Sequence, residues 1–274
     1  YAVLRIGGVV VEHNPLYTAP ELEEMFADHG ATVAIAWDVA APKIAGTGVQ
    51  HVLAVNLLDA FPPLKRFALS LPLAKLRATR DKLHQPMPSA DAWREVLTGP
   101  RLADDHPQPR PDDLAVIQYT SGTTGRVKGA MLSHRNLFAN ALQGAAWMKD
   151  AEDGNEVIYA VLPMFHAFGM TLYLTFGVLK RARIVLFPNV DIDMILDVAK
   201  TRPPTVYCAV PPIYERTAKR AQERGISLRS ARFCISGAMA LTDEVVDLWE
   251  SVSGGLLVEG YGLTECSPVA LGNP

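Results

Sequence analysis

The sequence predicts an α/β fold with largely parallel sheets and helices on both faces. Short apolar and β-branched runs alternate with longer amphipathic segments along most of the chain. The apolar runs are continuous, as in strands that are buried on both sides. With 274 residues, of which 49% are hydrophobic, the chain is long enough to bury a sizeable core. These observations together indicate parallel strands connected by helices.

The N-terminal part predicts three strands and one helix. The strands expected here cover residues 2–11, 32–37 and 51–57. Thr18 and Glu21 fit a capping box, and Pro20 lies in the first turn of the helix that follows. We expect this helix to continue to Gly30.

The rest of the chain predicts repeated strand and helix units. Ser133 is expected to cap a helix over residues 134–149, and a glycine-rich stretch to lead into that helix. The expected strands cover residues 113–119, 156–163, 182–188, 205–210, 231–237 and 255–262. The other expected helices lie at residues 169–179, 191–200, 213–225 and 242–252.

Residues 57–113 interrupt this alternation of strands and helices, because the segment is rich in proline and charged residues. Its first part carries a cluster of basic residues, namely Lys65, Arg66, Lys75, Arg77, Arg80 and Lys82, against Asp59 and Asp81. Interleaved leucines make residues 57–85 compatible with a basic amphipathic helix on an anionic membrane. A solvated surface helix is the alternative, and the short apolar stripe favours it. Residues 106–113 (HPQPRPDD) are typical of a linker.

These features divide the chain into three segments. Residues 1–56 are expected to form a first α/β portion. Residues 57–113 are expected to form the basic, proline-rich insertion and linker, and residues 114–274 a second α/β portion.

Composition excludes several classes of protein. The net charge is −3, so bulk charge suggests neither nucleic-acid binding nor an acidic tail. No apolar run approaches the ~20 residues that span a bilayer. Cys208, Cys234 and Cys266 lack CxxC spacing, so we expect reduced thiols and no structural zinc. We expect a cytoplasmic protein, peripheral at the inner membrane face if residues 57–85 bind lipid.

Residues 119–129 (YTSGTTGRVKG) combine glycines with hydroxyl side chains. Glycines allow the backbone to approach a ligand closely, and successive N–H groups in such a turn bind anions. The candidate phosphate-binding residues are Thr120, Ser121, Gly122, Thr123, Thr124, Gly125 and Lys128. No lysine stands in the register of a Walker A loop. The stretch therefore predicts another kind of polyphosphate site, with a flexible surface turn as the alternative.

A second polar stretch, residues 259–268 (EGYGLTECSP), follows an apolar strand. Tyr261 offers an aromatic face for a base, Thr264 a hydroxyl and Glu265 a carboxylate. Mg²⁺ prefers oxygen ligands and is commonly held by a carboxylate together with substrate phosphates. Glu265 alone would be interpreted as a surface carboxylate, so its occurrence with the glycine-rich stretch is what suggests a nucleotide site.

Together, YTSGTTGRVKG and GYGLTE resemble the adenylate-forming superfamily of acyl-CoA synthetases, adenylation domains and luciferases. Residues 14–31, 162–170 and 235–242 resemble further stretches of that family. The likeness is strongest to long-chain fatty-acid–CoA ligases and covers essentially the whole chain, most weakly over residues 57–113. It implies the core of the large N-terminal domain of an adenylate-forming enzyme.

The resemblance implies a two-step reaction and assigns residues to it. A fatty carboxylate and Mg·ATP would give acyl-AMP and pyrophosphate, and coenzyme A would then form the thioester. Residues 120–125 and Lys128 would hold the β- and γ-phosphates. Thr264 would contact the α-phosphate, and Glu265 with Thr120 would bind Mg²⁺. The remaining nucleotide-binding residues would be Gly237, Ala238, Met239, Gly260, Tyr261 and Gly262.

The resemblance also places His166 beside the reacting carboxylate. We favour a positioning or gating role over general-base catalysis, because the substrate acid is already ionised at neutral pH. A packed core histidine is the alternative. The implied acyl pocket comprises His166, Phe168, Gly169, Val210 and Pro211. Phe168 is equally compatible with core packing, and Pro211 with the start of a helix.

Alternatives to a fatty-acid ligase remain at this point. An aryl-CoA ligase of the coumarate type is the nearest, and a luciferase would share every motif. No acidic residue lies between Pro163 and Lys180 to hold an amino-acid ammonium group. Ala167 stands where fatty-acyl-AMP ligases tend to have aspartate. A non-catalytic nucleotide- or membrane-binding module is the alternative from another class.

The resemblance bears on the chain's length as well. The family's C-terminal domain, which carries the adenylation lysine, would follow Pro274. We therefore expect this chain by itself to bind nucleotide weakly and to be inactive.

Overall fold

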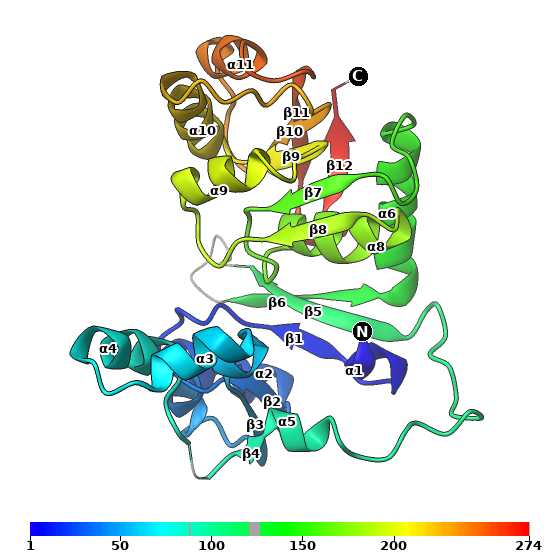
Figure 1. Cartoon of the computed structure of the whole chain (residues 1–274). Helices are drawn as coiled ribbons and strands as arrows, with labels where there is room; N and C mark the ends of the chain where they lie inside the picture. The colour runs from blue at the N-terminus through cyan, green and yellow to red at the C-terminus, as the bar shows by residue number, and fades with distance from the viewer. Residues whose placement is uncertain (88, 121–126, 274) are drawn as a thin grey trace. The chain divides into compact units, whose positions relative to one another are not determined.

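The structure is a computed structural model that describes residues 1–87, 89–120 and 127–273. The chain divides into two compact units, one of Tyr1–Glu12 with Gln108–Pro274 and one of His13–Pro107 (Figure 1). These boundaries differ from the three segments expected from composition.

A six-stranded sheet forms the centre of the larger unit. Its strand order is β12–β11–β10–β9–β7–β8. The strands are β7 (Val157–Ala160), β8 (Arg183–Leu186), β9 (Val206–Ala209), β10 (Phe233–Ser236), β11 (Leu257–Gly262) and β12 (Val269–Gly272). Neighbouring strands run parallel except for the pair β11–β12, which is antiparallel. The predicted α/β fold with a largely parallel sheet is confirmed.

The central strand β9 shows why the sheet needs helices on both faces. Tyr207 and Ala209 belong to one hydrophobic core, and Val206 and Cys208 belong to another. Successive side chains of a strand point to opposite faces, so a strand that is apolar at every position must be covered on both sides.

Helices supply that cover (Figure 1). The first core is closed by α9 (Ile192–Ala199), α10 (Pro211–Glu223) and α11 (Asp243–Glu250). The second is closed by α6 (His134–Trp147) and by a continuous run of α7 (Ala167–Gly169), the π-helix η3 (Met170–Phe176) and α8 (Gly177–Leu179). As predicted, Ser133 caps α6, and its hydroxyl accepts a hydrogen bond from the Asn136 N–H at 3.2 Å.

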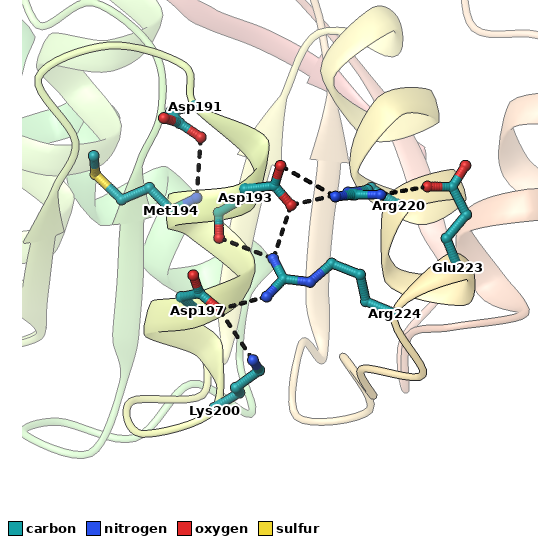
Figure 2. A network of polar contacts seen from close by, with 8 residues as sticks. All are labelled: Asp191, Asp193, Met194, Asp197, Lys200, Arg220, Glu223 and Arg224. Carbon is teal, nitrogen blue, oxygen red and sulfur yellow. Dashed lines mark hydrogen bonds and ion pairs between the residues drawn. The ribbon is translucent and has the colours of Figure 1, made fainter.

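An ion network joins α9 to α10 at the surface (Figure 2). Arg220 of α10 and Arg224, the C-cap residue of that helix, both bind the carboxylate of Asp193, at 2.8 and 2.9 Å. Arg224 also binds Asp197. The network adds polar contacts outside the apolar packing of these two helices.

A second sheet in the same unit has the order β1–β5–β6, from β1 (Val10–Glu12), β5 (Leu114–Thr120) and β6 (Lys128–Ser133). Two predictions are wrong here. Residues 2–11 do not form one strand, because α1 (Ala2–Arg5) precedes β1 and Gly7, with φ of +82°, turns the chain between them. The glycine-rich stretch does not lead directly into a helix, because β6 pairs antiparallel with β5 before α6 begins.

The smaller unit contains a parallel sheet of β2 (Val33–Trp37), β3 (His51–Val55) and β4 (Asp91–Ala92). Its α2 (Ala19–His29) has the predicted capping box of Thr18 and Glu21 and ends at Gly30, whose φ is +64°. The other helical elements are η1 (Ala41–Ile44), η2 (Leu57–Ala60), α3 (Pro63–Ser70), α4 (Ala74–Leu83) and α5 (Trp93–Val96).

The basic segment forms two short helices, α3 and α4, and not one long amphipathic helix. Leu64 and Phe67 of α3 are 79% and 64% exposed. Across the parts of the chain that the structure describes, no helix combines the length and apolar character needed to cross a membrane.

Candidate active site

The predicted site residues follow the carboxyl ends of four parallel strands of the six-stranded sheet. His166 lies in the connection after β7, and Val210 and Pro211 follow β9. Gly237 to Met239 follow β10, and Thr264 and Glu265 follow β11. Because neighbouring strands among β7, β9, β10 and β11 are parallel, these loops emerge at one edge of the sheet. Ligands of open α/β sheets bind outside the carboxyl ends of the strands.

The glycine-rich stretch connects β5 to β6. Thr120 pairs with Lys128 in the antiparallel register, so the two ends of the connection lie together. Gly129 has a packing reason to be glycine, because a Cβ there would lie 2.7 Å from Cγ2 of Ile117. Five of the predicted phosphate-binding residues lie outside the described part of the chain: Ser121, Gly122, Thr123, Thr124 and Gly125. Their role stays a prediction.

The strand that carries Lys128 packs against the turn that carries Thr264 and Glu265. That turn is η4 (Thr264–Cys266), a single 3₁₀ turn between β11 and β12, and β6 contacts it. The fold therefore places the strand that begins at Lys128 next to a turn more than 130 positions later in the sequence. Lys128 itself is exposed.

Glu265 is the candidate metal ligand. Its side chain is exposed, and no ion pair or hydrogen bond joins its carboxylate to another described residue. Within the described ranges, no three His, Cys, Asp or Glu side chains gather into a metal-binding cluster. A single open carboxylate fits Mg²⁺ that is shared with substrate phosphate oxygens and water. It does not fit a closed all-protein cage.

The residues predicted to bind adenine line one surface cavity of about 480 Å³. Its walls include Ala238 and Met239 after β10, and Gly260, Tyr261 and Gly262 of β11. Gly237 lies next to this wall, because a Cβ there would be 3.3 Å from the Gly260 carbonyl oxygen. Tyr261 is 57% exposed, which leaves the face of its ring open to a planar ligand. The structure thus joins two groups of residues predicted from separate motifs.

Ala238 has an unusual backbone conformation in this cavity. Its φ is +66°, a region that costs a residue with a Cβ about 1–2 kcal/mol. Such strain persists only where the surroundings hold the backbone, and it is concentrated at functional sites. One such restraint is the hydrogen bond from the Leu241 N–H to Oε1 of Glu259, at 3.3 Å.

His166 begins the helical run at the end of the β7 connection. Its Nδ1 accepts a hydrogen bond from the Phe168 N–H at 3.3 Å, and this bond caps α7. Desolvation lowers the pKa of the ring below its usual value of 6.5, so the imidazole is neutral at pH 7. The structure therefore shows His166 as the cap of α7, and its role beside the reacting carboxylate stays a prediction.

Phe168 connects this helix start to the adenine-side turn, and Gly169 packs against the preceding loop. A Cβ on Gly237 would lie 3.2 Å from Cε1 of Phe168. A Cβ on Gly169 would lie 2.1 Å from the Pro163 carbonyl oxygen, so only glycine fits there. Phe168 also packs against the second core, and its place in an acyl pocket stays a prediction.

Val210 and Pro211 lie at the start of α10, with Val210 as the N-cap residue and Pro211 in the first turn. Val210 packs against the first core. Helix capping and core packing are sufficient structural reasons for Val210 and Pro211 at these positions. Their place in an acyl pocket stays a prediction.

Sequence motifs missed part of the cavity. Glu259, Leu271 and Asn273 line it alongside the predicted residues. Glu259 is the first residue of the polar stretch 259–268, but the sequence did not indicate it as a residue of the cavity wall. Leu271 and Asn273 come from the antiparallel strand β12 and its end, which the sequence did not predict as a strand.

Comparisons with known proteins agree with this geometry. The AMP-binding enzyme family matches residues 1–274. A long-chain-fatty-acid–CoA ligase of Bacillus subtilis is 36% identical over the whole chain. A rice 4-coumarate–CoA ligase is 31% identical over 98% of the chain. The chain spans 49% of the length of the bacterial relative and 45% of that of the rice one.

Solved structures show the same fold. The apo structure of MatB from Rhodopseudomonas palustris superimposes with a TM-score of 0.75 and 27% identity, covering 100% of this chain and 48% of that one. An anthranilate–CoA ligase bound to anthranoyl-AMP superimposes with a TM-score of 0.80 and 21% identity, covering 99% of this chain and 48% of that one. With the family match extending over its whole length, this chain belongs to the AMP-binding enzymes.

Proposed function

We propose that the polypeptide carrying this chain is a fatty acid–CoA ligase. The observation that carries the proposal is the common edge of the sheet, where an open carboxylate, an open aromatic face and the strand of Lys128 belong to neighbouring elements. The names of the bacterial relatives support a long-chain fatty acid as the substrate.

The first step is attack of a fatty carboxylate oxygen on the α-phosphorus of ATP. A P–O bond forms to the acyl group, the bond to the β-phosphate oxygen breaks, and pyrophosphate leaves. Negative charge increases on the departing pyrophosphate, so cations and hydrogen-bond donors that stabilise this charge accelerate the step. Lys128 and the backbone N–H groups of the glycine-rich connection would supply positive charge and hydrogen bonds there.

Thr264 and Glu265 would act at the other side of the reacting phosphate. The Thr264 hydroxyl would donate to an α-phosphate oxygen, and the Glu265 carboxylate with Thr120 would hold Mg²⁺. Bound Mg²⁺ would neutralise phosphate charge in the transition state. Tyr261 and the turn at Gly237–Met239 would orient the adenosine, so that the α-phosphorus faces the incoming carboxylate.

The second step is attack of the coenzyme A thiolate on the acyl carbonyl, with AMP as the leaving group. Neutral His166 would position the acyl end during both steps. It would not need to remove a proton in the first, because the acid is already a carboxylate at pH 7.

Calorimetric titration with three non-hydrolysable adenylates tests the substrate class. The probes are long-chain acyl, aryl and aminoacyl sulfamoyl-adenosine, titrated into this chain and into the full-length polypeptide that carries it. Tightest binding of the long-chain probe supports a fatty-acid ligase. Tightest binding of the aryl probe would instead support the coumarate-type alternative, which the rice relative also favours.

Turnover separates a ligase from a non-catalytic module. We expect fatty-acid-dependent ATP–pyrophosphate exchange and then acyl-CoA formation by the full-length polypeptide. Binding of the probes without exchange would favour the non-catalytic alternative, and oxygen-dependent light emission would favour a luciferase.

We also propose that α3 and α4 make peripheral contact with an anionic membrane. Exposed Leu64 and Phe67 flank the exposed basic residues Lys65 and Arg66 in α3, a combination typical of interfacial segments. Leu64→Ser with Phe67→Ser should reduce co-sedimentation with phosphatidylglycerol vesicles. Leu97→Ser is the matched control, because Leu97 is 66% exposed outside these helices. Wild-type binding by the double variant would contradict the proposal.

A further inference from the structure

The turn that carries Thr264 and Glu265 has little structure of its own. The 3₁₀ turn η4 covers only three residues. The Leu263 N–H donates to the Pro268 carbonyl at 3.0 Å, and the Ser267 N–H donates to the Thr264 carbonyl at 3.1 Å. These bonds close the loop but leave its position relative to the rest of the site to external contacts.

Asn140, on α6, supplies one such contact. Its side-chain Nδ2 donates to the Val269 carbonyl at 2.8 Å, and its Oδ1 accepts from the Val269 N–H at 3.2 Å. Val269 begins β12 at the edge of the sheet. The amide therefore satisfies two backbone groups that an edge strand would otherwise present to solvent.

The Asn140 contact is buried and fully directional. The side chain is 3% exposed, and its Nδ2 also donates to Oε1 of Gln143 at 3.1 Å. An amide that donates and accepts to the same residue fixes both the distance and the orientation of that residue. Asparagine in a helix interior has no propensity advantage, so these contacts are the physical reason for its place here.

Thr171, on the π-helix η3, supplies a second contact. Its hydroxyl donates to the Ser267 carbonyl at 2.9 Å, and the residue is 4% exposed. Ser267 is itself buried, with φ of +75°. Two side chains from separate helices thus hold two backbone positions, 267 and 269, directly after the candidate catalytic pair.

The helix α6 also connects this turn to the glycine-rich hairpin. Ser133 is the last residue of β6 and the N-cap of α6. The strand β6 and the helix α6 are therefore consecutive, with Lys128 at the start of the strand and Asn140 about two turns into the helix. A displacement of β12 relative to α6 would therefore change the separation between the strand of Lys128 and the Thr264–Glu265 turn.

We propose that Asn140 and Thr171 are positioning residues for acyl-adenylate formation. They hold the Thr264–Glu265 turn at a fixed place relative to the strand of Lys128, and neither touches substrate. The inference rests on the proposed function, since it concerns the step at the α-phosphate.

The test uses the full-length polypeptide that carries this chain and pairs each variant with a control from the same helix. Asn140→Ala removes the contact with Val269, whereas Asn136→Ala removes the capping box of α6 and leaves that contact intact. Thr171→Val removes the hydroxyl that reaches Ser267. Thr175→Val removes a hydroxyl that bonds only within η3, to the Thr171 carbonyl at 2.8 Å.

The measurements are kcat and KM for ATP in fatty-acid-dependent ATP–pyrophosphate exchange, together with the thermal midpoint of each variant. We expect Asn140→Ala and Thr171→Val to lower kcat about 10–100-fold, the cost of a misplacement near 1 Å. The KM for ATP should change less than about threefold, because the cavity for adenine is unaltered. Thr171→Ser, which keeps the hydroxyl, should restore kcat.

Three results would overturn the inference. The first is wild-type kcat in both variants. The second is a loss of kcat in Asn136→Ala and Thr175→Val that matches the loss in the test variants, since kcat would then follow helix stability alone. The third is failure of Thr171→Ser to restore the rate. If the wild-type polypeptide catalyses no exchange with any carboxylic acid, the proposed function fails as well, and this result is distinguishable from the other three.

Discussion

Two carboxylates at opposite edges of the six-stranded sheet have opposite surroundings. Glu156 precedes β7 at the amino edge and is 0% exposed. It accepts hydrogen bonds from the Glu152 N–H at 2.8 Å, from the Arg232 guanidinium at 2.9 Å and from the Thr205 hydroxyl. Glu265 follows β11 at the carboxyl edge, is exposed, and has no partner among the described residues.

The difference separates a structural edge from a candidate binding edge within one sheet. Thr205 and Arg232 precede β9 and β10, so the Glu156 network joins the starts of three strands. A buried carboxylate with hydrogen bonds to both of its oxygens from within the protein stabilises the fold. A carboxylate that remains open can accept a cation or a ligand, and the residues around it are glycines and hydroxyls that leave room for one.

Removing the buried hydrogen bonds of Glu156 should cause the largest decrease in stability among these variants. Glu156→Ala leaves the Thr205 hydroxyl and the Glu152 N–H without their buried acceptor, and each such group costs about 1–3 kcal/mol. Arg232 is 46% exposed and can regain water, so we expect a total loss of about 2–4 kcal/mol. Urea unfolding measures it.

Glu152→Ala is the control for that experiment. The Glu152 side chain is exposed on the same loop, and its removal should change stability by less than about 0.5 kcal/mol. If Glu156→Ala and Glu152→Ala lost the same amount of stability, the buried hydrogen bonds of Glu156 would make no special contribution to the free energy of unfolding.

Breaking the binding edge should affect catalysis and leave stability unchanged. Glu265→Gln keeps the shape of the side chain but removes the charge proposed to hold Mg²⁺. We expect the kcat of ATP–pyrophosphate exchange to fall about 100-fold or more, as when one group that stabilises transition-state charge is lost. The unfolding midpoint should stay at the wild-type value, because Glu265 has no described partner to lose.

Glu244→Gln, in the first turn of α11, is the matched control and should keep the wild-type rate. Full exchange activity in Glu265→Gln would show that the open carboxylate has no part in adenylate formation.

The sequence predicted features that depend on nearby residues. The capping box at Thr18 and the helix cap at Ser133 both involve hydrogen bonds across three positions, so the residues that form them are close in the sequence. The alternation of apolar runs and amphipathic segments predicted the parallel sheet, because strands buried on both faces are apolar at every position. Motifs after β10 and β11 predicted residues that the structure brings into one cavity.

Features that depend on distant pairing were not predictable in the same way. β6 contains Gly129 and Ala130, which do not favour strands, and it forms because β5 lies beside it. The contact of Asn140 with Val269 joins residues 129 positions apart. No local pattern around Asn140 distinguishes it from a surface asparagine, and only the fold shows its two backbone partners.

Removing contacts from the α9–α10 network should cause the smallest decrease in stability. This network also pairs carboxylates with guanidinium groups, as Glu156 does, but it lies at the surface in contact with water (Figure 2). Arg224→Met removes the bonds to Asp193 and Asp197 but keeps an apolar stem over the helix. Exposed ion pairs are screened by solvent and salt. We therefore expect only a small decrease in the unfolding midpoint at neutral pH, similar to that of Lys219→Met, which removes a single pair with Glu215.

The pH dependence of that decrease identifies its cause. A hydrogen bond from Arg220 lowers the pKa of Asp193 below 3.8, and hydrogen bonds from Lys200 and Arg224 do the same for Asp197. A carboxyl group whose pKa is lowered by folding stabilises the protein above its unfolded value of 3.8 and loses this contribution as the pH falls through the folded value. The difference between wild type and Arg224→Met should therefore disappear in acid and shrink in high salt. A loss as large as that of Glu156→Ala, or one that persists in acid, would show that the network acts through packing, and the contrast between buried and exposed carboxylates would not hold for this sheet.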